Sequence, residues 1–217
     1  MEPITLFITI IFFIYCTIFF IHILWKSRKI DWAVKYYYFG IAMYIILFVI
    51  SQSMFVINEM LYTGSSGVPQ QYYFLYILAN FIGQMAIFGI IVVVEKYVYN
   101  KFHYIPSAIT LISAVLILVL PRINDTSLMI YYILIAAFVG ALIPFIYFRT
   151  GFQVSGKPRN KSFIIGCGLI IFILGVLLNT YFLLELIPIL AIIAPIVQFV
   201  GIIIFHYGFL IYYELVE

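Results

Sequence analysis

Three polar side chains in one apolar stretch have types and spacing that could do chemistry inside a membrane. Asn80 and Gln84 are four residues apart, and Gln84 and Glu95 are eleven residues apart. At 3.6 residues per turn these steps are close to one and three turns, so a helix would carry all three on one face. Such groups are costly in hydrocarbon. This stripe of three polar residues has two interpretations. It could form a polar path through the bundle, with Glu95 and Lys96 as an ionic switch at its end. Alternatively, Asn80 and Gln84 form hydrogen bonds that hold helices together, and Glu95 is solvated.

Further polar residues extend this pattern into other apolar stretches. Gln52 and Glu59 are two turns apart, and Gln198 follows Pro195 by about one turn. The proline ring frees a backbone carbonyl near Gln198. Pockets between helices of a bundle are common ligand sites, whereas the alternative roles are interhelical hydrogen bonding and solvation at the headgroups. The predicted ligand-binding residues are Gln52, Asn58, Glu59, Asn80, Gln84, Asn179, Glu185 and Gln198.

Catalytic and cofactor motifs are missing from the sequence. His22, His103 and His206 lack the spacing of a metal site, and His22 and His206 are expected to form local hydrogen bonds. Paired aspartates and a G-x-S-x-G elbow are also absent. No lysine follows Lys161, so a retinal Schiff base is excluded. We therefore expect no enzymatic activity, no metal and no cofactor.

The amino-acid composition indicates that these polar residues lie in a membrane protein. The chain has 217 residues, of which 66% are hydrophobic and 9% are charged. Soluble domains carry about 25% charged residues, and a spanning helix needs about 20 mostly apolar residues. The sequence thus predicts an all-α membrane protein with one domain, a bundle of seven transmembrane helices. The predicted spans are 4–25, 36–61, 72–94, 105–120, 127–148, 162–184 and 186–213.

The basic residues predict the orientation of the bundle. All of the eleven Lys and Arg residues except Arg122 lie in the connections after the first, third and fifth spans. Because cytoplasmic loops are rich in Lys and Arg, these connections are expected inside the cell, with the N-terminus outside and the C-terminus inside. Residues 155–162, SGKPRNKS, would then be a cytoplasmic loop, in which Ser162 caps the next helix. It lacks the frame of a phosphate loop. Its basic residues are Lys157, Arg159 and Lys161.

One segment carries a family resemblance. The basic run Gly156-Lys157-Pro158-Arg159-Asn160-Lys161, followed by Gly166, Gly168 and Gly175, resembles the seven-transmembrane sensor region that precedes histidine kinases in bacteria and archaea. In that family the last helix leads into an output domain, whereas this sequence ends at Glu217. The resemblance therefore implies either a sensor whose output lies in a separate partner or a trimmed module of a longer protein, and it assigns no residue roles.

The sequence is compatible with three functions. The first is a receptor or sensor that binds a small ligand in an outward-facing polar pocket and signals through its basic cytoplasmic loops. The second is a small-solute transporter with a topology like that of SWEET sugar transporters. The third is a structural membrane subunit. The expected location is the cell membrane, as a multi-pass protein. Candidate partners are the lipid bilayer, a cytoplasmic signalling protein and a second copy of the chain; no nucleic acid is expected.

Overall fold

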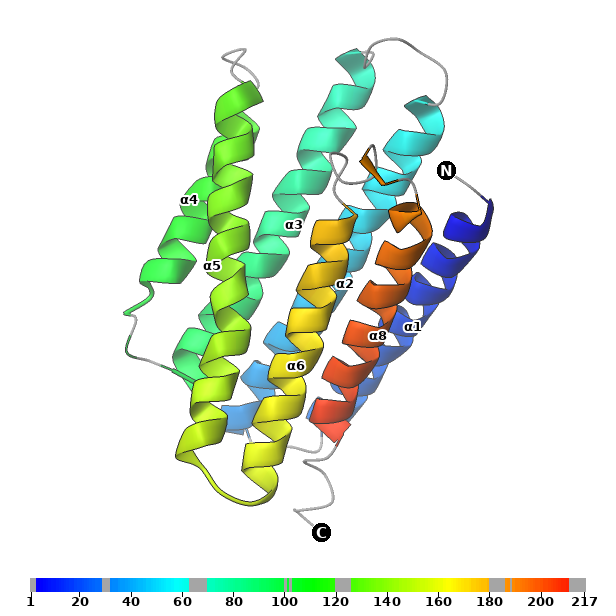
Figure 1. The fold of residues 1–217 in the computed structure, drawn as a ribbon. Coiled ribbons are helices and arrows are strands. Elements are labelled where there is room, and N and C mark those ends of the chain that lie inside the picture. The colour runs from blue at the N-terminus through cyan, green and yellow to red at the C-terminus, as the bar shows by residue number, and fades with distance from the viewer. Residues whose placement is uncertain are drawn as a thin grey trace. The chain divides into compact units, whose positions relative to one another are not determined.

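A computed structural model describes residues 3–28, 32–62, 70–99, 101, 103–119, 126–179, 186–187 and 189–210. These ranges contain seven helices and no strand, which confirms the all-α class (Figure 1). The helices overlap the seven predicted spans. They are α1 (Pro3–Ser27), α2 (Trp32–Tyr62), α3 (Gln70–Tyr97), α4 (Ile105–Val119), α5 (Thr126–Gln153), α6 (Lys157–Leu178) and α8 (Leu190–Leu210).

The helices have the apolarity of membrane spans. Within the described ranges, five are long and apolar enough to cross a bilayer: α1, α2, α3, α6 and α8. Helix α4 is also apolar, but its 15 residues rise only about 22 Å, less than the roughly 30 Å of hydrocarbon. The chain is a helical membrane protein, while the number of seven spans and their orientation stay predictions.

The structure corrects the boundaries of the basic segment. Helix α5 continues to Gln153, and α6 begins at Lys157 instead of Ser162. The N-cap of α6 is Gly156, with φ 71° and no side-chain cap, so the expected cap at Ser162 is wrong. Pro158 is tolerated in the first turn because the amide hydrogen it lacks would have no intrahelical partner there. The three basic residues of the predicted loop therefore lie on the first turns of a helix.

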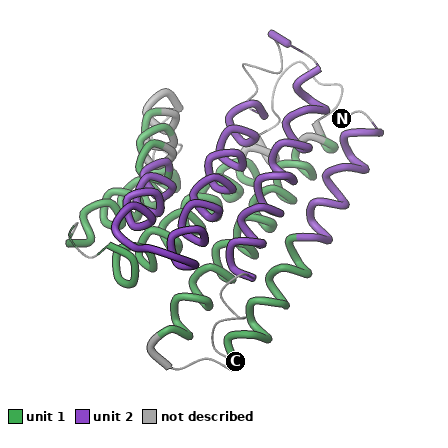
Figure 2. The backbone as a smooth tube through the Cα atoms, turned by 60° about the horizontal axis from the view of Figure 1, so that its bottom comes forward, with its two compact units in different colours: residues 1, 16–140 green, residues 2–15, 141–217 purple. Residues whose placement is uncertain are grey.

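The chain divides into two compact units (Figure 2). Unit 1 holds residues 16–140, and unit 2 holds residues 2–15 and 141–217. Helices α1 and α5 each contribute one part to both units.

Unit 1 is built around α3, which packs against α2 and α4. Tyr37 of α2 meets Tyr97 of α3, with ring centroids 6.2 Å apart, whereas Phe55 meets Tyr76 at 5.5 Å. Early residues of α2 thus meet late residues of α3, so the two helices are antiparallel. On α4, Ile117 packs with Ile77 and Phe81 of α3.

In unit 2, α6 and α8 approach each other through glycines. A Cβ atom at Gly168 would lie 2.8 Å from the Cα of Phe205, and one at Gly201 would lie 2.6 Å from the Cα of Phe172. The absence of a side chain at each glycine therefore lets the backbones of α6 and α8 contact each other. The spacing of seven residues from Gly168 to Gly175 and from Gly201 to Gly208 repeats this contact along both helices.

Candidate functional site

Helix α3 carries two of the predicted site residues at buried positions of unit 1. Ile77, Phe81 and Gln84 follow one another at steps of four and three residues, so they share one face. Ile77 and Phe81 pack against α4. Glu95 is eleven residues beyond Gln84 and returns to the same face. Of the predicted stripe of Asn80, Gln84 and Glu95, the last two are buried, whereas Asn80 is half-buried.

Gln84 is a buried amide with an unsatisfied acceptor. Its side chain is 4% exposed. Its Oε1 atom accepts no hydrogen bond from the part of the chain that the structure describes. A buried acceptor left in this state costs about 1 to 3 kcal/mol of desolvation. The site would gain that free energy from any group that brings a donor.

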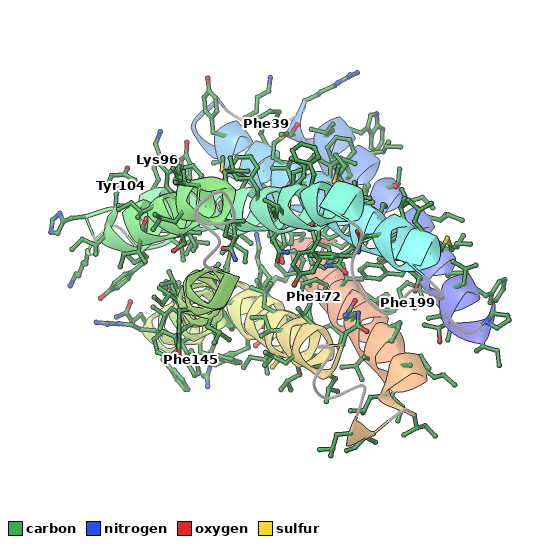
Figure 3. The ribbon with its side chains drawn as sticks, turned by 90° about the horizontal axis from the view of Figure 1, so that it is seen from above. Phe39, Lys96, Tyr104, Phe145, Phe172 and Phe199 are labelled. Atoms are coloured by element: carbon green, nitrogen blue, oxygen red, sulfur yellow. The ribbon has the colours of Figure 1, made fainter. Side chains whose placement is uncertain are left out.

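Glu95 is a buried carboxyl group near the C-terminal end of α3. It is 2% exposed, and neither of its oxygens accepts a hydrogen bond from a described residue. The alternative of a solvated Glu95 is therefore wrong. Its neighbour Lys96 is exposed (Figure 3). The Lys96 Nζ lies 5.2 Å from the centroid of the Tyr97 ring. The predicted switch pair thus places one group inside the protein and the other on its surface.

Helix α4 adds buried hydroxyl groups that the sequence reasoning missed. Ser107, Thr110 and Ser113 are all buried. Their hydroxyls donate to the carbonyl oxygens of Tyr104, Pro106 and Ile109 of their own chain segment, at 2.8 to 2.9 Å. This is the usual arrangement of hydroxyls in helices. The three-residue spacing was the available signal, but Ser and Thr stand out weakly in an apolar run.

The α2 candidates occupy less enclosed positions in unit 1. Gln52 is half-buried, and Asn58 is half-buried with an Oδ1 atom that accepts no bond from a described residue. The Glu59 side chain lies outside what the structure describes. A polar contact between α2 and α3 is made instead by Ser51, whose Oγ donates to the Ala79 carbonyl at 2.7 Å.

Asn80 also bonds locally. Its Nδ2 donates to the carbonyl oxygen of Tyr76, one turn earlier on α3, at 2.9 Å. This bond stays within one helix, so it does not link α3 to a neighbour. Asn80 is half-buried, whereas Gln84, one turn further on, is buried.

In unit 2, two candidates converge on one backbone carbonyl. Gln198 of α8 is 5% exposed, and its Nε2 donates to the carbonyl oxygen of Gly175 on α6 at 3.1 Å. Asn179 forms the C-cap of α6, and its backbone N–H lies 3.2 Å from the same oxygen. The Asn179 side chain is exposed, and Glu185 lies outside the described residues. Gln198 thus bonds two helices together, as the alternative role of these amides requires.

His206 forms a hydrogen bond, as expected, but the bond crosses between helices and is not local. Its Nδ1 lies 2.8 Å from the hydroxyl of Tyr15, and the two rings meet edge to face within unit 2. Tyr15 also packs edge to face on Phe199 of the same helix as His206. The histidine therefore joins α1 to α8, a partner that the sequence did not indicate.

The basic residues of α6 contact aromatic rings. The Arg159 guanidinium lies 5.6 Å from the Phe163 ring centroid, and the Lys161 Nζ lies 5.6 Å from that of Phe209 on α8. Lys157 and Arg159 are exposed, whereas Lys161 is half-buried. Lys161 therefore covers the end of the α6–α8 pair in addition to carrying charge.

The predicted ligand residues fall in both units. Gln52, Asn58, Asn80 and Gln84 belong to unit 1, and Asn179 and Gln198 belong to unit 2. Within the described ranges, no three His, Cys, Asp or Glu residues are grouped as metal ligands. No protein-family model matches the chain, and comparisons with characterised proteins and with solved structures give no match.

Proposed function

We propose that this chain is a multi-pass membrane receptor or sensor whose ligand-responsive group is the buried face of α3. The observation that carries the proposal is the pair of buried side chains, Gln84 and Glu95, whose acceptor oxygens bond to no described residue. Ionisable and amide groups inside a membrane are usually there for function. A ligand, or a second conformation of the protein, that supplies hydrogen-bond donors to Gln84 and Glu95 would be stabilised by these bonds.

Contrast with other polar groups of the bundle supports this assignment. Ser51 and Gln198 each donate to a carbonyl oxygen of a neighbouring helix. Their polarity is accounted for by packing, so they need no ligand. Gln84 and Glu95 have no such bond at their oxygens. The function therefore belongs to unit 1, and the amide of Gln198 is structural.

The geometry of α3 supports a role in signalling. Gln84 and Glu95 are eleven residues apart on one continuous helix, a rise of about 16 Å. One small ligand cannot touch both. We propose that a ligand binds near Gln84, and that a shift of α3 changes the surroundings of Glu95 and Lys96, which the positive-inside rule places at the cytoplasmic end.

A transporter is the second candidate. Two polar groups without hydrogen-bond partners on one face of α3 would also suit two successive binding sites along the translocation pathway of a solute. The two functions differ in flux, because a receptor binds a solute without moving it across the bilayer.

The test measures binding and flux on the same preparations. The purified protein in lipid nanodiscs is heated with a library of small polar solutes, and the unfolding midpoint is recorded for the wild type, Gln84→Met and the control Met85→Leu. A solute that stabilises the wild type and the control but not Gln84→Met supports the proposal. Uptake of that solute by proteoliposomes would instead establish the transporter. If every solute acts equally on all three proteins, Gln84 has no ligand and the structural subunit stands.

A further inference from the structure

The end of α5 and the start of α6 form a basic and aromatic surface within unit 2. Arg149 and Phe152 lie near the end of α5, whereas Lys157, Arg159 and Phe163 lie on the first turns of α6. Helices α5, α6 and α8 contain no Asp or Glu, so no acid of these helices neutralises the positive charge. We infer that these five residues, the α5–α6 surface, bind the headgroup of an anionic phospholipid. This site is separate from Gln84 and does not depend on the proposed function.

A ring contact joins the two helices at this surface. Phe152 and Phe163 meet edge to face, with ring centroids 5.1 Å apart, and Phe163 also contacts Phe148 at 5.7 Å. Gly151 makes room for this contact, because a Cβ atom there would lie 3.3 Å from the Phe163 ring. The α5–α6 surface is therefore held together by packing between the two helices.

Both arginines lie about one turn from this ring pair. Arg149 precedes Phe152 by three residues on α5, and Arg159 precedes Phe163 by four residues on α6. Residues at these spacings are neighbours on a helix surface. The Arg159 guanidinium accordingly lies 5.6 Å from the Phe163 ring centroid. The contact between Phe152 and Phe163 thus brings a basic residue of each helix to the same surface.

The Arg159 side chain has donors to offer to an anion. It is exposed, and no described residue accepts a hydrogen bond from it. A guanidinium carries five N–H donors in a planar fork and keeps its charge in proteins. This fork matches two oxygens of a phosphate group. Because contact with the Phe163 ring already restricts the side chain, less conformational entropy is lost when it binds.

The start of α6 adds to the positive charge. Gly156 is the N-cap of this helix and provides no side-chain hydrogen bond to the first turn. The helix dipole places partial positive charge at the same end. Lys157 is the first residue of α6 and is exposed. An anion at the α5–α6 surface therefore meets three basic side chains and the positive end of a helix.

Exposed rings of α5 favour a phospholipid over a soluble anion. Phe145 and Phe152 are 62% and 75% exposed. Arg149 lies between them on the same face of α5, four residues after Phe145 and three before Phe152. An acyl chain can cover Phe145 while the headgroup contacts the basic residues. Inorganic phosphate has the charge but no acyl chain, so it would leave this apolar surface uncovered.

The position of the surface along the helix also favours a lipid. Helix α6 is long and apolar enough to cross a bilayer, and its charged residues are confined to its first turns. Such helix ends lie at the level of the lipid headgroups. Each Lys or Arg near a membrane surface that contains anionic lipid strengthens binding about fivefold, or by about 1 kcal/mol.

The experiment measures the binding of defined lipids to the purified protein in detergent micelles. Fluorescently labelled protein is titrated with dioleoylphosphatidylglycerol or dioleoylphosphatidylcholine, each with and without inorganic phosphate at constant ionic strength. We expect the anionic lipid to bind about tenfold more tightly than the zwitterionic one, and phosphate to leave this binding unchanged. Equal binding of the two lipids would overturn the inference, because the charge would not be recognised. Displacement by phosphate would overturn it as well, because the site would then take a soluble anion.

Two exposed arginines allow a matched pair of variants. Arg159→Gln removes a guanidinium from the α5–α6 surface, and Arg28→Gln removes the same group from an exposed position of unit 1. We expect the affinity for phosphatidylglycerol to fall about fivefold in Arg159→Gln and to stay within about twofold of the wild type in Arg28→Gln. An unchanged affinity in Arg159→Gln, or an equal loss in Arg28→Gln, would contradict the inference, because binding would not depend on this surface.

A second variant covers an Arg159→Gln protein that fails to fold. Lys157→Gln changes an exposed side chain at the first position of α6 and should also lower the affinity about fivefold. The unfolding midpoint verifies that each variant is folded. Wild-type affinity in a folded Lys157→Gln would count against the site. The lipid measurement does not involve Gln84, so this inference and the proposed function fail separately.

Discussion

The side-chain amide of Gln198 on α8 donates a hydrogen bond to the carbonyl oxygen of Gly175 on α6 over 3.1 Å. The same glycine lets α8 approach, since a Cβ atom at Gly175 would lie 2.7 Å from the Cγ of Gln198. The amide nitrogen of Gln198 thus takes part in the packing of two helices. Gln84 of α3 is buried to the same degree and has no such bond at its oxygen. That difference separates Gln198, whose amide links two helices, from Gln84, for which we propose a function.

Glycine substitutions should show where the helix backbones touch. Gly168→Ala places a Cβ 3.0 Å from the Gly201 carbonyl oxygen and 2.8 Å from the Phe205 Cα, so α6 and α8 must separate. We expect a loss of about 1 to 3 kcal/mol in the free energy of unfolding. Gly89→Ala is the control because its Cβ meets nothing within 4 Å, and it should be neutral or stabilising by up to about 1 kcal/mol. Denaturant unfolding in mixed micelles measures both; equal losses would contradict the contact.

Ser51 and Gly83 should be energetically coupled. A Cβ at Gly83 would lie 2.9 Å from the Ser51 Oγ, which bonds to the Ala79 carbonyl. Gly83→Ala should therefore be destabilising in the wild type and less so when Ser51→Ala has already removed the hydroxyl. We expect a coupling free energy of about 0.5 kcal/mol or more in the double-mutant cycle. Additive effects would show that the two residues do not touch.

Replacing Glu95 by an apolar residue of similar length should separate function from stability. Glu95→Met removes two buried oxygens that have no hydrogen-bonded donor among the described residues. We expect it to raise the free energy of unfolding by about 1 to 3 kcal/mol and to abolish the response to ligand. Unfolding and ligand response are measured on the same nanodisc sample. A destabilised Glu95→Met would mean that the carboxyl group has a structural partner.

Cysteine labelling should report the predicted orientation from one helix. Lys157 opens α6 and Asn179 closes it, and both side chains are exposed. In a background with Cys16→Ser and Cys167→Ser, an impermeant thiol reagent should label Asn179→Cys in intact cells and Lys157→Cys after the cells are opened. The reverse pattern would invert the topology and place the basic end of α6 outside.

The helices could be predicted from the sequence better than their ends. Runs of about 20 apolar residues locate the seven helices. The boundaries of α5 and α6 differ from the prediction because a helix can extend beyond its apolar residues when the backbone conformation of the flanking polar residues permits it. Pro158 suits a first helical turn and Gly156 takes a positive φ, so charged residues at 157–161 are helical. Hydropathy does not contain that information.

The candidate site was predictable in part. Helical spacing placed Gln84 and Glu95 on one face, and both are buried. Interhelical bonding was one of the roles predicted for Gln198, but its partner could not be predicted, because that partner is a backbone carbonyl at Gly175, which has no side chain. Thr110 was missed because its burial depends on how α4 packs against α3, where Ile117 lies with Ile77.

The most direct measurement compares the same substitution at the two buried amides. Gln84→Met and Gln198→Met each replace an amide by an apolar side chain of equal length. Their free energies of unfolding are measured in one lipid system, without ligand. We predict that Gln198→Met loses about 1 kcal/mol with its interhelical bond, and that Gln84→Met is unchanged or more stable. A loss in Gln84→Met as large as that in Gln198→Met would contradict the account, because Gln84 would then be a structural residue as well.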